Sequence, residues 1–420
     1  MWRRLILGGV LLAGLVAAAM PLRADGGTTL TVDGYVNGGD FKSGVISFTL
    51  DRMDQRFELN ASFVPDADGL YQAISDSASK DISVTVHFDP DTAYIDSATS
   101  RPTYIARSIE FQGKTYVGDT ASPARSGVGL LGPREQAEFA LGRGIAYANA
   151  GDTKTARPLL DAALNYPELS AGLKALAAKA RGGVIEGEAL INWPVGDERD
   201  RLMLAALTDF KTWSKLAPDD EDAIASVASA YAELGAYAEA RKLDEDAAAR
   251  WSDRAFWSLV GIARIDRMTG DLAASLRDLD KVQSLAGATA GMPYHYHRGW
   301  TLAALGRDEE AIDEFTEGLK AQPDYAWAYL RRSCSEAALG RLTEALDDYN
   351  QGASLARKDY KSIPDGTGKT ADLARLDQVA ARLQSALAQD PRRKISGLCD
   401  GYWDWGDETR ARSKLLPPSP

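Results

Sequence analysis

Residues 304–315 read ALGRDEEAIDEF, and residues 338–349 read ALGRLTEALDDY. In both stretches a Gly is followed five positions later by Ala and, four positions after that, by an aromatic residue. A pattern that returns at such a distance, about 34 residues, is typical of stacked helix pairs, in which each pair buries its apolar face only against its neighbours. The two stretches therefore predict a helical solenoid.

Earlier copies of the same pattern indicate a longer array. Its glycines are Gly151, Gly235, Gly270, Gly306 and Gly340, and the last four follow one another at a nearly constant distance. A Gly in this place ends the first helix of a pair, because it adopts a left-handed backbone at the least cost. The Ala that follows is expected where two helices cross closely, and the large residue after it fills the gap between them.

This arrangement resembles the tetratricopeptide repeat family over about residues 137–359, and the resemblance implies an all-α solenoid, which we place at 136–359. Five clear units are expected to start near residues 137, 221, 256, 292 and 326. A sixth, degenerate unit is expected at 171–220, with an inserted loop in GGVIEGEALINWPVGDE (182–198). The amphipathic stretch 371–389 predicts a final helix that caps the solenoid, and residues 390–420 form a tail.

The region 25–117 has a different periodicity. Apolar and polar residues alternate in GVISFTL (44–50), FELNASFV (57–64) and ISVTVHF (82–88), which is typical of strands with one buried face. A single short helix is expected at 66–81, between the third and the fourth strand. This element order is similar to a small barrel of the oligonucleotide/oligosaccharide-binding (OB) type, and a small β-sandwich is the alternative.

Residues 118–135 are rich in Gly, Ser and Pro and lack periodicity, so they are predicted to form a linker. The predicted fold class is therefore α+β with two domains. A small N-terminal β barrel or sandwich is followed by an all-α solenoid of the tetratricopeptide type.

The segment 1–24 has the composition of a secretory signal peptide. Two arginines precede an apolar run from Leu5 to Met20, and small residues follow it. We expect cleavage after Ala24, although Ala19 also fits, and an uncleaved anchor is the alternative. No later stretch of the sequence is apolar enough to span a membrane. The protein is therefore predicted to be periplasmic or secreted, with no membrane span after cleavage.

The charge balance disfavours nucleic acid as a partner. The chain has 48 Lys and Arg against 60 Asp and Glu, a net charge of −12. The segment 1–24 contains three arginines, so the mature chain would carry 45 − 60 = −15. Such a polyanion repels phosphate backbones, and we expect it not to bind nucleic acid.

No set of residues in the sequence predicts catalysis. PDGTGKT (364–370) lacks the first Gly of a phosphate-binding loop, and SASK (77–80) lacks the companion motifs of serine acyl enzymes. DPDTAYID (89–96) fits ordinary turn chemistry better than a calcium loop. Two cysteines and three histidines leave little material for a metal or nucleophilic site. We therefore expect a protein that is not an enzyme and has no catalytic residue, cofactor or metal.

The family resemblance implies a binding surface on the solenoid. In this family the concave groove is lined by fixed positions of the first helix in each unit. Carried over to this sequence, those positions hold Trp257, Val260, Arg264, Arg267, Tyr296, Trp300, Trp327, Leu330 and Cys334. Several large aromatic residues on one face predict a groove that binds an apolar peptide or helix of a partner protein. The alternative is that individual members pack between units as core.

The sequence contains only two cysteines, Cys334 and Cys399. Two thiols in an oxidising compartment are able to pair, so we expect a disulfide between them, with two separate thiols as the alternative. The bond would bring Tyr402, Trp403 and Trp405 of the tail to the groove.

Together these features predict an exported adaptor that mediates protein–protein interactions within an envelope complex. The alternative is a ligand-binding protein whose β domain holds an oligosaccharide, with the solenoid as its docking module. Exposed aromatic rings at Tyr35, Tyr94 and Tyr104 would favour this alternative.

Overall fold

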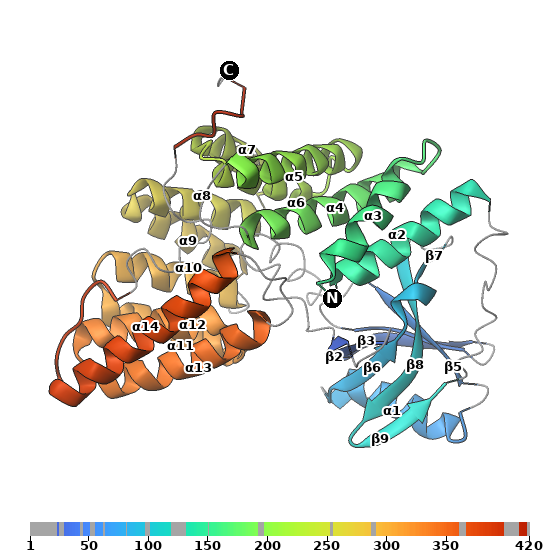
Figure 1. The fold of residues 1–420 in the computed structure, drawn as a ribbon, viewed down its shortest axis with the longest axis horizontal. Coiled ribbons are helices and arrows are strands. Elements are labelled where there is room, and N and C mark those ends of the chain that lie inside the picture. The colour runs from blue at the N-terminus through green and yellow to red at the C-terminus, as the bar shows by residue number, and fades with distance from the viewer. Residues whose placement is uncertain are drawn as a thin grey trace. The chain divides into compact units, whose positions relative to one another are not determined.

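The computed structural model divides the chain into two compact units (Figure 1). The main part of the first unit runs from Ala18 to Val184, and the second takes in the described residues from Ile185 onward except Lys215–Ala217. The described residues are 23–24, 29–42, 45–50, 55–61, 64–80, 82–96, 101–118, 132–149, 151–191, 197–252, 255–286, 291–360, 367–398 and 411–417. Nearly all of the expected signal peptide, 1–22, lies outside them.

The first unit begins with β-strands and one helix. The strands are β1 (Arg23–Ala24), β2 (Leu30–Gly34), β3 (Val36–Lys42), β4 (Val45–Leu50), β5 (Arg56–Asn60), β6 (Val84–Phe88), β7 (Tyr94–Asp96), β8 (Arg101–Phe111) and β9 (Lys114–Val117). Helix α1 (Ala67–Lys80) lies between β5 and β6 in the chain, and the 3-10 helix η3 (Pro90–Thr92) precedes β7.

Strand pairing and the direct connection between β2 and β3 together form a barrel. The pairing path is β2–β6–β8–β5–β4–β3, and its two ends, β2 and β3, are separated in the chain only by Tyr35. Of these pairs β5 with β8 is parallel and the other four are antiparallel. Counted along the chain, with β2 and β3 taken together as the first strand, α1 lies between the third strand, β5, and the fourth, β6, which is the order of an OB-type barrel. The barrel, rather than the sandwich, describes the β region.

The alternation read from the sequence places the barrel core. Residues of β5 and β6 are buried at every second position. Three of the buried rings meet in the centre: Phe88 stacks on Tyr104 at 4.9 Å between ring centres, and Phe57 packs edge-on against Tyr104 at 5.5 Å. These rings come from β5, β6 and β8, so the aromatic contacts join the two halves of the pairing path.

Three helices complete the first unit: α2 (Pro133–Asn149), α3 (Thr153–Leu164) and most of α4 (Ala171–Ile191). Helix α2 packs directly on the barrel, where a Cβ added at Gly142 would lie 2.9 Å from Cα of Tyr94. The Tyr147 hydroxyl donates to the Asp91 carboxylate at 3.0 Å, and Arg143 forms an ion pair with the same group. The compact unit thus contains the β region and the first helix pair, while most of the expected linker (119–131) lies outside the described residues.

Helix α4 corrects one expectation. The stretch 182–191, predicted as part of an inserted loop, continues the helix as far as Ile191. Its glycines cost helix stability, but the buried side chains of Val184, Ile185 and Ala189 offset that cost by packing. Residues 192–196 of the predicted loop lie outside the described residues.

The second unit contains successive helices: α5 (Asp197–Leu216), α6 (Glu221–Glu233), α7 (Tyr237–Arg250), α8 (Phe256–Thr269), α9 (Leu272–Ala286), α10 (Gly291–Ala304), α11 (Asp308–Ala321), α12 (Ala326–Leu339), α13 (Leu342–Tyr360) and α14 (Thr367–Gln389). From α6 onward each helix packs on the next, and the first helices α6, α8, α10 and α12 also contact one another in that order. Figure 1 shows the pairs as stacked layers.

The repeated residues occupy the predicted places. Gly235, Gly270, Gly306 and Gly340 all have positive φ, between 71° and 90°, and each lies one or two positions after the end of the first helix of a pair. The crossing alanines are fully buried, as are the large residues after them, for example Phe315. This confirms the predicted role of the Gly in each copy.

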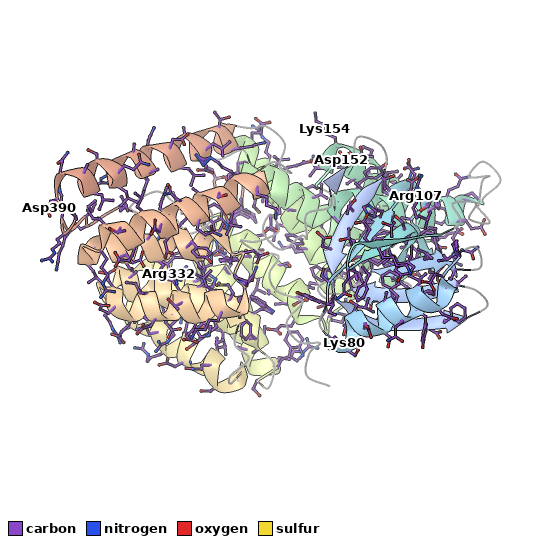
Figure 2. All side chains as sticks on the ribbon, turned by 90° about the horizontal axis from the view of Figure 1, so that it is seen from below. Lys80, Arg107, Asp152, Lys154, Arg332 and Asp390 are labelled. Atoms are coloured by element: carbon purple, nitrogen blue, oxygen red, sulfur yellow. The ribbon has the colours of Figure 1, made fainter. Side chains whose placement is uncertain are left out.

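Capping side chains mark other helix starts. Asp152, labelled in Figure 2, accepts a hydrogen bond at 3.1 Å from the backbone N–H of Thr155 at the start of α3. Asp220 accepts a hydrogen bond from the backbone N–H of Asp222 in the same way, at 3.2 Å, at the start of α6.

The C-terminal end of the solenoid is covered by α14. This helix begins at Thr367 and packs Leu376, Leu383 and neighbouring side chains on the last helix pair.

Candidate functional site

One tryptophan ring of the solenoid contacts the guanidinium groups of two arginines. The guanidinium carbon of Arg331 on α12 lies 3.5 Å from the ring centre of Trp300 on α10, and that of Arg267 on α8 lies 4.2 Å from it. We call these three residues the arginine–tryptophan stack. Each of them comes from the first helix of a different unit, so the stack spans three consecutive repeats. An aromatic face attracts cations, and the attraction grows where water is excluded.

Neighbouring rings hold the tryptophan in place. Tyr296, one turn before Trp300 on α10, packs edge-on against it with ring centres 5.7 Å apart. Tyr296 also contacts Tyr325 at 5.3 Å and Phe315 at 6.2 Å. Since Phe315 and Tyr296 are buried, the half-buried Trp300 ring rests on the repeat core.

The predicted groove residues divide into two groups. Trp257, Trp300 and Trp327 are half-buried, whereas Val260, Arg264, Arg267, Tyr296 and Leu330 are buried. Only Arg267 and Trp300 among them belong to the stack. Leu330 has no exposed surface and lies against α13, where a Cβ added at Gly352 would be 2.7 Å from its Cγ. Core packing, the stated alternative, describes this residue.

Arg331 was not among the predicted residues. Its signal in the sequence was its place four positions after Trp327, which puts both on one face of the helix. The family positions that the resemblance implies on this helix include Leu330 and Cys334 but not Arg331.

Arg264 has a structural partner. Its guanidinium donates to Glu233 Oε1 at 2.6 Å, and the fully buried Arg199 pairs with the other oxygen of the same carboxylate. Arg199 also donates to the backbone carbonyl of Glu233 at 3.0 Å. Two arginines thus enclose one buried carboxylate, which joins α5, α6 and α8.

Glu186 on α4 lies near this ion cluster. Burial first, and then the charge of Glu233, raise the pKa of Glu186 well above its usual range. Within the described part of the chain neither of its carboxylate oxygens has a hydrogen-bond partner. A neutral carboxyl is therefore the form this environment favours. The sequence analysis gave Glu186 no role, since it expected a loop there.

A second acidic group is perturbed on α12. Arg332, labelled in Figure 2, pairs with both oxygens of Asp348 and donates to the Thr316 hydroxyl at 2.9 Å. Burial and then the Asp348 charge raise the pKa of Glu336 to about 8. The arginine is thus committed to Asp348, and Glu336 is left with a weaker attraction to it.

Cys334 is half-buried and disulfide-bonded. It lies three positions after Arg331, on the same face of α12. Cys399, the other cysteine of the sequence, lies outside the described residues, so the pairing of these two cysteines stays a prediction.

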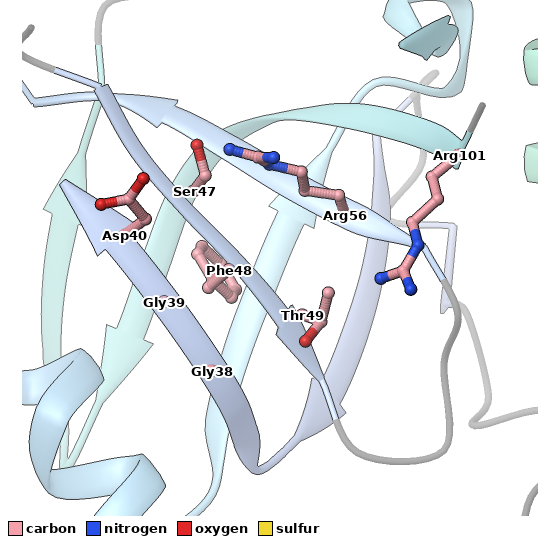
Figure 3. Close-up of a pocket in the computed structure, with 8 residues that line it drawn as sticks. All are labelled: Gly38, Gly39, Asp40, Ser47, Phe48, Thr49, Arg56 and Arg101. Carbon is pink, nitrogen blue, oxygen red and sulfur yellow. The ribbon is translucent and has the colours of Figure 1, made fainter. Parts of the chain in front are cut away.

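The barrel has a small open hollow of about 240 Å³ over β3, β4, β5 and the start of β8. It is lined by Gly38, Gly39, Asp40, Ser47, Phe48, Thr49, Arg56 and Arg101. Figure 3 shows Asp40 and Arg101 at opposite sides with Arg56 between them. In the pairing circuit, β3, β4 and β5 lie side by side.

The tyrosines considered for a barrel ligand have different surroundings. Tyr104 is fully buried in the core, and Tyr94 is half-buried with its hydroxyl donating to Glu58 at 2.9 Å. Tyr35 is exposed to 39%. Of the three, only Tyr35 presents its ring to solvent.

Two findings concern metals and membranes. Among the described residues no group of three or more His, Cys, Asp or Glu side chains is arranged to hold a metal ion. Asp89 of the acidic turn instead accepts a hydrogen bond from Arg107, labelled in Figure 2. Within the described ranges, no helix has the length and apolar character needed to cross a membrane.

Comparisons with known proteins point to the repeat family. A family model for the tetratricopeptide repeat matches residues 293–325, which cover most of α10 and all of α11. No curated protein sequence matches the chain. Solved structures of similar fold include the human IFIT1 dimer with PPP-AAAA, at 15% identity and a TM-score of 0.44. That match covers 61% of this chain and 56% of the IFIT1 chain, so this chain spans little more than half of it.

Two other solved structures match at a comparable sequence identity. NprR in complex with its cognate peptide NprX has 14% identity and a TM-score of 0.44, covering 60% of this chain and 74% of that chain. MamA 41-end from Desulfovibrio magneticus RS-1 has 16% identity and a TM-score of 0.32, covering 45% of this chain and 98% of that chain.

Proposed function

We propose that this chain, a tetratricopeptide-repeat protein, is an adaptor that binds a segment of a partner protein on the surface of α8, α10 and α12. The arginine–tryptophan stack carries the proposal. It places two cations and an aromatic ring at the junction of three repeats, with the ring half-buried and supported by Tyr296. In this proposal the chain acts by binding and not by catalysis.

The chemistry of the stack favours a particular kind of segment. Arginines at a binding surface pair with carboxylates, and aromatic anchors contribute most of the binding energy in many interfaces. A peptide with acidic and aromatic side chains would satisfy both features. Repeat solenoids offer an extended surface for such segments.

The test uses peptides selected from a random library against the purified full chain. Their affinities are then measured for the wild type, for Trp300→Ala and for Tyr71→Ala as a matched control. Tyr71 is an aromatic residue of α1 that is 56% exposed. Trp300→Ala should weaken binding by about 2 kcal/mol, roughly 30-fold, with unchanged helical circular dichroism. Equal affinity for the wild type and Trp300→Ala would refute the proposal.

The location in the cell envelope rests on the segment 1–24. Its basic head, apolar run and small-residue exit support export. Strand β1 (Arg23–Ala24) pairs with β2, so cleavage after Ala24 would remove it and cleavage after Ala19 would keep it. N-terminal sequencing of the purified mature protein distinguishes the two sites, and an intact Met1 in the membrane fraction would contradict export.

A second candidate function is ligand binding by the barrel, and the hollow over β3, β4 and β5 favours it. Arg56 and Arg101 would attract an oligosaccharide that carries carboxylate or sulfate groups. Calorimetric titration of the full chain with acidic and neutral oligosaccharides tests this. Arg101→Ala should remove the binding of acidic oligosaccharides, whereas Arg107→Ala, on the same strand but paired with Asp89, should retain it. Equal binding by both variants would contradict a site in the hollow.

A further inference from the structure

Two described parts of the C-terminal tail dock on different repeats. The backbone N–H of Ile395 donates to the carbonyl of Ala337 near the end of α12 at 2.8 Å. The backbone N–H of Ser413 donates to the carbonyl of Leu234 at the end of α6, also at 2.8 Å. Arg412 reinforces the second contact with hydrogen bonds to Glu239 on α7 at 2.7 and 3.2 Å. Figure 1 shows the last described segment beside α7, away from α14.

The chain between these two anchors is short. Residues 399–410 lie outside the described residues, and 411 − 398 = 13 steps separate their described neighbours. The first helices α6, α8, α10 and α12 contact one another in order. Packed helices lie about 10 Å apart, so the three steps span on the order of 30 Å. An extended chain of this length reaches about 43 Å. The segment is therefore long enough to cross α10 and α8.

The composition of the segment complements the surface it would cross. The stretch CDGYWDWGDETR contains four acidic and three large aromatic residues but only one arginine. The stack holds Arg267 and Arg331 on either side of Trp300 in the repeat order, and both arginines are buried, at 8% and 7% exposure, beside the half-buried ring. Carboxylates of the segment would meet arginines, and its rings would meet an aromatic surface.

The predicted disulfide would fix the start of the segment 399–410 on α12. Cys334 is disulfide-bonded and faces the same side of α12 as Arg331. The predicted bond to Cys399 would hold the first residue of the segment beside the stack.

We propose that residues 399–410 lie along α12, α10 and α8 as an intramolecular ligand of the arginine–tryptophan stack, which a partner segment must displace. This rests on the proposed function, because it assigns the same surface to both occupants. It also gives the partner a chemistry: an acidic segment with tryptophan, similar in composition to the tail. The adaptor would then bind partners only when they compete with its own tail.

Photocross-linking of the full chain tests the position of the segment. Trp403 is replaced by the photoreactive residue benzoylphenylalanine, and cross-linked peptides are mapped by mass spectrometry. We expect cross-links within one chain to peptides of α8, α10 or α12. The same residue at Lys414, between the described anchors Arg412 and Leu416, is the positive control and should cross-link to α6 or α7. Cross-links from position 403 to any other element, or only between chains, would overturn the proposal.

Competition tests the displacement. A labelled synthetic peptide of residues 400–410 is titrated against the wild-type full chain and against full-chain Trp403→Ala/Trp405→Ala. We expect the variant to bind the peptide at least tenfold more tightly, because its own segment competes less. Equal affinity, or no binding to either form, would overturn the proposal.

The two proposals fail in different experiments. Suppose that position 403 cross-links elsewhere while Trp300→Ala still weakens the library-selected peptides. The tail inference is then wrong, and the binding surface stands. If Trp300→Ala leaves those peptides unaffected also in the Trp403→Ala/Trp405→Ala background, where the tail competes less, the proposed function is wrong, and the inference that rests on it falls too.

Discussion

The guanidinium of Arg331 stacks on Trp300 at 3.5 Å, and this contact joins the units of α10 and α12. With Arg267 at 4.2 Å from the unit of α8, one ring links three repeats. Neighbouring repeats of a solenoid stabilise one another through such interfaces. The stack therefore contributes to stability as well as to the proposed binding surface.

Two substitutions of Trp300 distinguish the contribution of its aromatic face to stability from that of its apolar bulk. Trp300→Phe keeps an aromatic face for both guanidinium groups, whereas Trp300→Leu removes it. We expect the Leu variant to be less stable than the Phe variant by about 1 kcal/mol in urea unfolding. The difference should shrink in an Arg331→Met background, since the closer of the two cations is then missing. Equal unfolding midpoints for the two variants would show that the stack contributes no cation–π energy.

The contact between Gly142 and Tyr94 predicts a steric effect. Gly142→Ala should place a methyl group 2.9 Å from the backbone of Tyr94 and push α2 away from β7. We expect a loss of about 1–3 kcal/mol in the free energy of unfolding. Gly172→Ala in α4 is the matched control, because nothing lies within 4 Å of its added Cβ. That variant should be neutral or slightly more stable, and a similar loss for both would refute the packing argument.

Removing one partner of the buried carboxylate should be costly. Arg199→Ala would leave Glu233 paired with Arg264 but without the cation on its other oxygen. We expect a loss of about 3 kcal/mol, measured by urea unfolding, because the buried charge is no longer fully compensated. Arg250→Ala removes a solvent-exposed pair with Asp219 and should cost less than about 1 kcal/mol. The argument fails if the two variants lose the same amount.

The raised pKa of Glu336 predicts a pH dependence. Its folded-state pKa is about 8, above the ordinary value of 4.5, so the folded state holds this proton more tightly than the unfolded state. The resulting stability is complete below pH 4.5 and is lost as the pH rises through about 8. The loss is on the order of 1–2 kcal/mol after allowance for solvent screening.

Glu336→Gln should abolish this part of the pH dependence. Thermal unfolding between pH 5 and 9 is the measurement, with the wild type falling more steeply than the variant. Glu168→Gln, at an exposed position, should keep the wild-type slope. Parallel slopes for the wild type and Glu336→Gln would count against the assignment.

The predicted bond between Cys334 and Cys399 has a chemical test. Mass spectrometry of an unreduced digest should find the two peptides joined. Cys334→Ser and Cys399→Ser should lower stability by the same amount, up to about 4 kcal/mol for a closed loop of about 64 residues. Free thiols at both positions would rule out the bond.

The sequence by itself determined the repeat of helix pairs and the positions of the turns within them. The return of Gly, Ala and an aromatic residue at a nearly constant distance marked the helix pairs, and positive φ at Gly235, Gly270, Gly306 and Gly340 confirms the turns. Alternation likewise marked the barrel strands. These signals are local: they depend on the period of one helix or strand and on the conformational freedom of one residue.

Local signals failed where packing outweighed propensity. The glycines at 182, 183 and 187 suggested a loop, yet α4 runs through them because Val184 and Ile185 are buried. Strand alternation fits a barrel and a sandwich equally well. Only the strand pairing distinguishes the two folds. Strand β5 pairs with β8, and β2 and β3 pair with β6 and β4 respectively, which is the arrangement of the barrel.

The site depended still more on tertiary structure. The carried-over positions included Trp300 and Arg267, which meet in the structure, but they also included Leu330, which has no exposed surface, and omitted Arg331. Arg199 and Glu233 are far apart in the chain and meet only when α5 packs near α6. A helix period tells which residues share a face. Which face meets which neighbour, and which charges are then buried together, is decided by the angle and spacing of the packed helices.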